Sequence, residues 1–198
     1  MGNNLSQFIL FLIMIHFDCI DGKNVALCPI NPDHFPLFLK WKNDPKLREF
    51  NSNRAAAIDI EQLKREIQEP RPVLPESFSF EIYYKPENKL VGQCGLHSFA
   101  WRDGRAQLGI EIGEREYWGR GIGTETYQLL VTYGFTQLEL HKIVATINAP
   151  NIGSQTAVQR AGLTFEAQLK EWTFADGKYY DRYIYGITED EWRALNEY

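Results

Sequence analysis

The sequence predicts an α+β fold, in which a mixed, mostly antiparallel sheet and several helices form one domain. Residues 77–113 hold three successive segments of alternating polar and apolar residues, which is typical of a strand meander. The last of these strands leads into a glycine-rich loop and an apolar-periodic helix over residues 124–135. Two long strands then flank an Asp176-Gly177 turn. These observations favour strand pairs with helices packed on them.

The remaining elements follow from the same periodicities. We expect strands at residues 24–30 and 142–147, and helices at residues 34–42, 58–68 and 154–160. Asp33 can cap the first of these helices. A Thr188-x-x-Glu191 capping box predicts a final helical turn.

Composition excludes several classes of function. The net charge of −5 and the lack of a basic stripe argue against nucleic acid, and a mildly acidic surface suits a cationic amine. The four histidines lie far apart without metal-ligand spacing, so no metal is expected. Cys19, Cys28 and Cys94 are an odd number with no Cys-x-x-Cys motif. Unpaired cysteines of this kind predict a reducing compartment, the cytoplasm.

Residues 1–22 form an apolar N-terminal extension of undetermined role, ahead of a domain at residues 23–198. The apolar run of residues 8–15 is too short for a membrane span of about 20 residues, and no basic residue precedes it. We expect a buried or dimer-contact extension, or an upstream start codon. Secretion or membrane attachment is a second reading. Lipidation is a third, because residues 1–6 fit a myristoylation pattern.

The glycine loop predicts an anion site. Gly119, Gly121 and Gly123 alternate just before the helix, where the first backbone N–H groups lack partners and carry partial positive charge. No lysine follows Gly123, which excludes a nucleotide P-loop. The spacing also fails the Gly-x-Gly-x-x-Gly dinucleotide pattern, since Thr124 stands at the last position counted from Gly119. A phosphate group is the best-matched ligand.

This loop resembles the pyrophosphate loop of GNAT-type N-acetyltransferases. Trp118 stands where most of that family have Gln or Arg, as in the branch similar to the RimJ/RimL ribosomal-protein acetyltransferases. Further motifs similar to that branch follow in the same order, so that the resemblance covers about residue 23 to the C-terminus. They are Trp41-x-Asn43-Asp44-Pro45, Val91-Gly92-x-x-Gly95-Leu96, Asn151-x-x-Ser154, Ala161-Gly162-Leu163-x-Phe165-Glu166 and Asp176-Gly177-x-Tyr179-x-Asp181.

The resemblance implies direct acetyl transfer from acetyl-CoA to a primary amine, without a metal. It implies a three-layer α/β/α domain whose sheet is splayed at the acetyl-CoA site, between the strand ending near Gly113 and the strand of residues 142–147. A backbone N–H near Ile112 or Gly113 would then meet the thioester carbonyl, and Arg120 would add charge beside the diphosphate. The coenzyme-binding residues so implied are Ile112, Gly113, Trp118, Gly119, Arg120, Gly121, Ile122, Gly123, Thr124, Asn151 and Ser154.

The reaction also needs a base and a proton donor. We favour Glu111 as the base, because it lies next to the predicted gap, on the strand face opposite Leu108 and Ile110, where burial would raise its pKa. An exposed strand residue is the alternative reading of Glu111, and Glu171 is a second candidate base. Many relatives carry a Tyr proton donor where this chain has Val158, which leaves Ser154 as the candidate acid or as a simple helix cap.

The sequence therefore predicts an N-acetyltransferase acting on a primary amine. The acceptor is a protein N-terminus, a polyamine or another small-molecule amine; a non-catalytic acyl-CoA-binding module is the alternative of another class. We expect a monomer or homodimer without a nucleic-acid or membrane partner.

Overall fold

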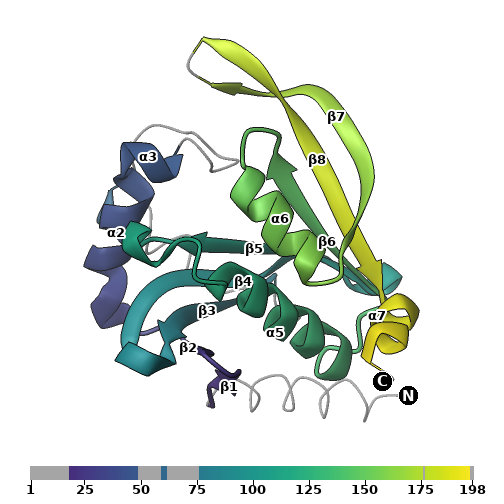
Figure 1. The fold of residues 1–198 in the computed structure, drawn as a ribbon, viewed down its shortest axis with the longest axis horizontal. Coiled ribbons are helices and arrows are strands. Elements are labelled where there is room, and N and C mark those ends of the chain that lie inside the picture. Colours follow the sequence, from purple (N-terminus) through teal and green to yellow (C-terminus); the bar gives the residue numbers. More distant parts are fainter. Residues whose placement is uncertain (1–17, 49–58, 62–75, 176, 197–198) are drawn as a thin grey trace.

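The protein is an eight-stranded sheet with helices on both faces (Figure 1). The computed structural model describes residues 18–48, 59–61, 76–175 and 177–196. The strands stand in the order β1-β2-β3-β4-β5-β6-β8-β7, and only β5 and β6 run parallel. The predicted mixed, mostly antiparallel sheet is confirmed. Its strands are β1 Ile20–Asp21, β2 Val25–Pro29, β3 Ser77–Tyr84, β4 Lys89–Ala100, β5 Arg105–Ile112, β6 Lys142–Asn148, β7 Thr164–Ala175 and β8 Lys178–Thr188.

Helices cover the two faces unequally. On one face, α5 (Ile122–Thr136) and α6 (Ile152–Arg160) lie side by side and close the main core. On the other face, α2 (Phe35–Asn43) and α3 (Pro45–Arg48) pack on a smaller cluster around Phe38 and Trp41. The β7–β8 hairpin extends beyond the rest of the sheet in Figure 1. The three-layer arrangement is thus present.

Most predicted elements agree with the observed bounds to within two residues. The predicted capping box is present, since Thr188 N–H donates to Glu191 Oε2 at 2.8 Å and Glu191 N–H donates to Thr188 Oγ1 at 3.3 Å, at the start of α7 (Glu189–Asn196). The predicted helix at 58–68 lies mostly outside the described residues. In the part of the chain that is described, no helix is long and apolar enough to cross a membrane.

The central parallel pair is open over half its length. β5 and β6 pair only from Arg105 with Lys142 to Leu108 with Ala145. Beyond that point β5 continues beside β4, and β6 continues beside β8. The two strands therefore part at their carboxyl ends, as the predicted splayed sheet requires, and the first turns of α5 and α6 lie at this gap.

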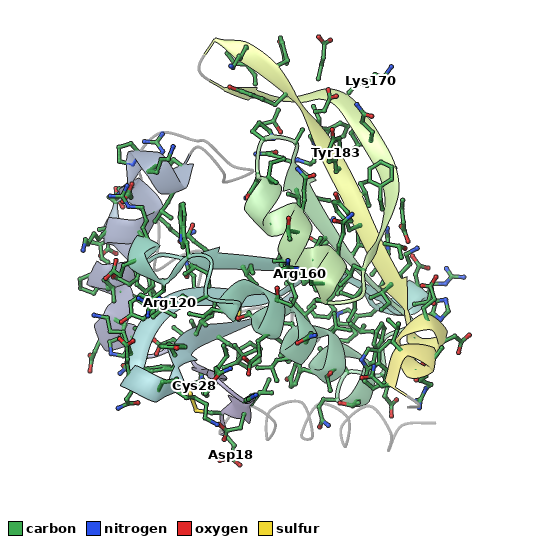
Figure 2. All side chains as sticks on the ribbon, viewed as in Figure 1. Asp18, Cys28, Arg120, Arg160, Lys170 and Tyr183 are labelled. Carbon is green, nitrogen blue, oxygen red and sulfur yellow. A yellow bond between two sulfur atoms is a disulfide. The ribbon has the colours of Figure 1, made fainter. Side chains whose placement is uncertain are left out.

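One prediction about the cysteines was wrong: Cys19 and Cys28 are joined in a disulfide, whose sulfur atoms lie near the Cys28 label of Figure 2. Ile20 pairs with Leu27 across the β1–β2 hairpin, so Cys19 and Cys28 face each other on the next rung. The boundary drawn at residue 22 falls inside this hairpin. Since disulfides are typical of oxidising compartments, cysteine usage no longer supports a reducing one. Cys94 is free and buried.

Candidate active site

A cavity of about 1600 Å³ passes through the gap between β5 and β6. Its wall combines the glycine loop and the start of α6 on one side of the sheet with Gln93, His97 and Glu111 on the other. A cavity that opens on both faces allows two substrates to approach one point from opposite sides. Direct transfer between two bound molecules needs this geometry.

The glycine loop leaves room for a ligand at its backbone. Gly119 and Gly121 have φ values of 74° and 81°, in the left-handed region that glycine tolerates. A Cβ atom at either position would have no protein atom within 4 Å. Gly121 caps α5, whose first intrahelical bond runs from Glu125 N–H to Gly121 O at 3.1 Å. The N–H groups of Ile122, Gly123 and Thr124 therefore point ahead of the helix without an intrahelical acceptor, as an anion site requires.

The two large side chains of the loop take different positions. Trp118 Nε1 donates to Ile112 O at 2.8 Å, which fixes the loop to the end of β5. The Arg120 guanidinium lies 3.2 Å from Glu87 Oε1 and over the Tyr117 ring, 4.5 Å from its centroid. In this arrangement Arg120 contributes its backbone to the loop, while its side chain pairs with Glu87.

Of the two predicted thioester contacts, only one faces the gap. Gly113 N–H donates to Val91 O at 2.8 Å, which takes it out of the set of available donors. Backbone N–H and C=O groups point to alternate sides of a strand from one residue to the next. Since the N–H of Gly113 points toward β4, the N–H and C=O of Ile112 point away from β4, toward the gap. The bond from Trp118 to Ile112 O agrees with this direction. Ile112 N–H is thus the backbone donor placed to meet a carbonyl oxygen in the gap.

Glu111 lies in the cavity wall, on the face predicted for it. It pairs across the strands with Gln93, whose Nε2 donates to Glu111 Oε1 at 3.2 Å. Burial raises the pKa of Glu111, while the Lys42 charge and the Gln93 hydrogen bond oppose that rise. A carboxylate with a raised pKa is a better proton acceptor at neutral pH than an exposed one. Glu171 instead lies exposed on β7, where its N–H donates to Asp181 Oδ1 at 2.8 Å.

Ser154, at the start of α6, contacts a second hydroxyl side chain in the site, that of Tyr127 on α5. Asn151 caps the helix, its Oδ1 accepting from Ser154 N–H at 3.0 Å, and Ser154 Oγ lies 2.9 Å from the Tyr127 hydroxyl. Burial raises the pKa of Tyr127 to about 12, although the bond to Ser154 opposes the shift. Val158, at the predicted tyrosine position, is fully buried. Tyr127 was not predicted, because a tyrosine on the apolar face of α5 is indistinguishable in sequence from a core residue.

Comparisons with known proteins agree with this geometry. The family model described as "Acetyltransferase (GNAT) domain" matches residues 24–164. N-acetyltransferase p20 of Bacillus licheniformis is 28% identical over 155 residues, covering 77% of this chain and 86% of that protein.

Solved structures show the same fold at lower identity. Spermidine N-acetyltransferase from Vibrio cholerae, in complex with CoA and spermine, superposes with a TM-score of 0.76 at 18% identity, covering 87% of this chain and 99% of that one. The ribosomal alpha-N-protein acetyltransferase RimL, in complex with coenzyme A, gives 0.72 at 17% identity, covering 88% and 99%. With the family model matching well over half of its length, this chain belongs to the GNAT family of acetyltransferases.

Proposed function

We propose that this acyl-CoA-dependent N-acetyltransferase acetylates the N-terminal amine of a polypeptide. The observation that carries the proposal is the chemistry of the cavity wall on the acceptor side of the sheet. There, one carboxylate with a raised pKa stands among neutral hydrogen-bonding groups. These groups are Ser77, Ser79, Gln93 and His97.

Charge in this wall favours a peptide over a polyamine. On the acceptor side, the described part of the wall carries the acidic side chains Glu76 and Glu111 and one basic side chain, Lys42, an excess of one negative charge; Arg160 lies on α6, on the coenzyme side. A polyamine carries several positive charges, each of which needs a partner when it leaves water. A peptide N-terminus carries one positive charge, followed by neutral amide groups that suit hydroxyl, amide and imidazole side chains.

The residues then take the following roles in the proposed reaction. N–H groups of the loop from Gly119 to Thr124 bind the diphosphate of acetyl-CoA. Ile112 N–H donates to the thioester oxygen and stabilises the negative charge that develops there. Glu111 accepts a proton from the cationic amine, and the neutral amine attacks the carbonyl carbon. The carbon–sulfur bond breaks as the nitrogen loses its second proton, and the departing thiolate, stabilised by the Tyr127–Ser154 hydroxyl pair, takes up a proton in exchange and leaves as free coenzyme A thiol.

An acceptor panel tests the proposal. Release of free thiol from acetyl-CoA would be followed with peptides beginning with Ala or Ser, with spermidine and with an aminoglycoside. We expect kcat/KM at least tenfold higher for a peptide, and mass spectrometry should place one acetyl group on its α-amine. A preference for spermidine or the aminoglycoside would overturn the peptide proposal and leave a small-molecule acetyltransferase.

Location in the cytoplasm and a monomeric or dimeric state also stay predictions. The need for acetyl-CoA supports the cytoplasm, whereas the Cys19–Cys28 disulfide is an observation against it. Fractionation of the source cell and sedimentation of the purified chain test the two predictions.

A further inference from the structure

The acceptor side of the sheet carries its polar residues in rows. Paired residues on neighbouring strands point to the same face, as do residues two apart on one strand. Gln93 and Glu111 face each other in one row, and His97 and Gln107 face each other four residues away along the strands. The row between them is the pair Gly95 and Gly109. Two opposed glycines leave a trough across β4 and β5, between the predicted base and His97.

The two glycines differ in whether packing within the protein leaves room for a larger side chain. A Cβ atom at Gly95 would lie 2.3 Å from Phe78 O, so the close approach of β3 excludes any larger residue there. At Gly109 the nearest atom to an added Cβ is His97 Nε2 at 3.4 Å, an ordinary contact, and the next is His97 Cδ2 at 3.9 Å. Packing within the protein therefore does not demand a glycine at position 109. The space above Gly109 belongs to the cavity.

His97 lies over the far end of this trough. Its Nδ1 is 3.0 Å from Ser98 Oγ, and its Nε2 is the ring atom nearest to Gly109. Partial desolvation lowers the pKa of His97, which favours the neutral form of the ring. A neutral imidazole makes one directional hydrogen bond through Nε2, which suits an amide group better than a cation.

We propose that the acceptor lies across Gly109 with its reacting nitrogen beside Glu111 and its second peptide group at His97 Nε2. Glu111 and Gly109 are two positions apart on β5, which corresponds to about 7 Å, and His97 Nε2 lies over Gly109. In an extended peptide, the same distance separates the terminal nitrogen from the peptide group that joins its second and third residues. Gly109 and His97 are then specificity-determining residues. This inference rests on the proposed acetylation of peptide N-termini and adds the length and chemistry that the site selects.

The test compares two acceptors that differ only at the second amide. One is alanyl-alanine amide, and the other is the analogue in which an isopropyl group replaces the final carboxamide. We expect the wild-type enzyme to prefer the first by roughly threefold to tenfold in kcat/KM, the worth of one hydrogen bond. His97→Leu should abolish this preference, and His97→Gln, which places an amide near the position of Nε2, should restore part of it. His141→Leu is the matched control, because that histidine lies immediately before β6 and does not line the cavity.

Gly109→Ala tests the trough itself. The added methyl has room within the protein, so thermal unfolding and coenzyme A affinity should stay unchanged while KM for both dipeptide acceptors rises at least tenfold. If peptides are acetylated but the acceptor preference survives His97→Leu, or KM survives Gly109→Ala, this inference is overturned and the proposed function stands. If no peptide is acetylated, the proposed function fails and this inference fails with it.

Discussion

The hydroxyl of Tyr127 on α5 lies 2.9 Å from Ser154 Oγ on α6, and both side chains face the gap in which the sheet opens. The two residues are 27 positions apart. Their contact links the helix that begins at the glycine loop to the helix capped by Asn151. It also supplies two hydroxyl groups where the chain has Val158 in place of a tyrosine.

Removing the Tyr127 hydroxyl should slow acetyl transfer. In Tyr127→Phe, Ser154 loses its hydrogen-bond partner and the departing thiolate loses a polar group, so we expect kcat to fall about tenfold or more, with KM for acetyl-CoA nearly unchanged. Rapid-quench measurement of the first turnover would locate the loss in the chemical step. Tyr133→Phe is the matched control: its buried hydroxyl makes no hydrogen bond within the described part of the chain, and it packs on Phe80 in the core. Equal kcat in both variants would remove Tyr127 from the mechanism.

Gly121 in the glycine loop and Gly177 in the β7–β8 turn allow a matched pair of variants. Gly121 and Gly177 have φ values of 81° and 78°, and at both an added Cβ has no atom within 4 Å. Alanine therefore costs about the same 1–2 kcal/mol of backbone strain at each position. Only Gly121→Ala places a methyl group where the diphosphate would lie, so we expect its coenzyme A affinity to fall at least tenfold. By titration calorimetry, Gly177→Ala should bind like the wild type. Similar affinity in the two variants would argue against the phosphate site.

The raised pKa of Glu111 predicts how kcat/KM depends on pH. The carboxylate accepts a proton only when ionised, so kcat/KM should rise with pH through an apparent pKa above the ordinary glutamate value of 4.5. Glu111→Gln should lower kcat/KM by about 10²–10⁴-fold and remove this limb of the profile, while coenzyme A still binds. Full activity of Glu111→Gln across the pH range would show that another group is the base.

The raised pKa of Glu111 also makes the stability of the folded state depend on pH. Burial raises the pKa of Glu111 in the folded state above its unfolded value, so the folded state keeps this proton to higher pH. Its contribution to the free energy of unfolding is therefore largest below the unfolded-state pKa and is lost as the pH rises through the folded-state pKa. We expect Glu111→Gln to raise the midpoint of thermal unfolding at pH 8 relative to wild type, and to change it little at pH 4. The opposite ordering would mean that the folded state stabilises the ionised carboxylate, through the Lys42 charge and the Gln93 hydrogen bond, more than burial destabilises it.

The N-terminal disulfide predicts a response to reductant. Cys19 and Cys28 are nine positions apart, and a loop of that length corresponds to about 2–3 kcal/mol of stabilisation through the unfolded chain. The midpoint of thermal unfolding of the wild type should therefore fall when the disulfide is reduced. The midpoint of Cys19→Ser should not change when reductant is added. Thiol titration of the unreduced, unfolded chain should find one free cysteine, Cys94. Three reactive thiols would show that the pair is open in solution.

The sequence alone was sufficient for the local elements and for the glycine-rich loop before α5. Alternation of polar and apolar residues in the meander, the glycines before α5 and the Thr188 cap each depend on neighbours within a few positions. Their conformations follow from backbone sterics and from the period of burial, which a linear pattern records. For the same reason Glu111 could be assigned to the polar face of its strand before any fold was known.

Only the tertiary structure decided which distant groups meet. The disulfide depends on a hairpin register, the choice of Ile112 over Gly113 depends on a bond to Val91, and the pairing of Tyr127 with Ser154 depends on how two helices pack. His97 gained its candidate role in the same way, when strand pairing brought it over Gly109. Such contacts join residues whose separation in sequence carries no information about their separation in space, since burial of the whole apolar surface fixes them together.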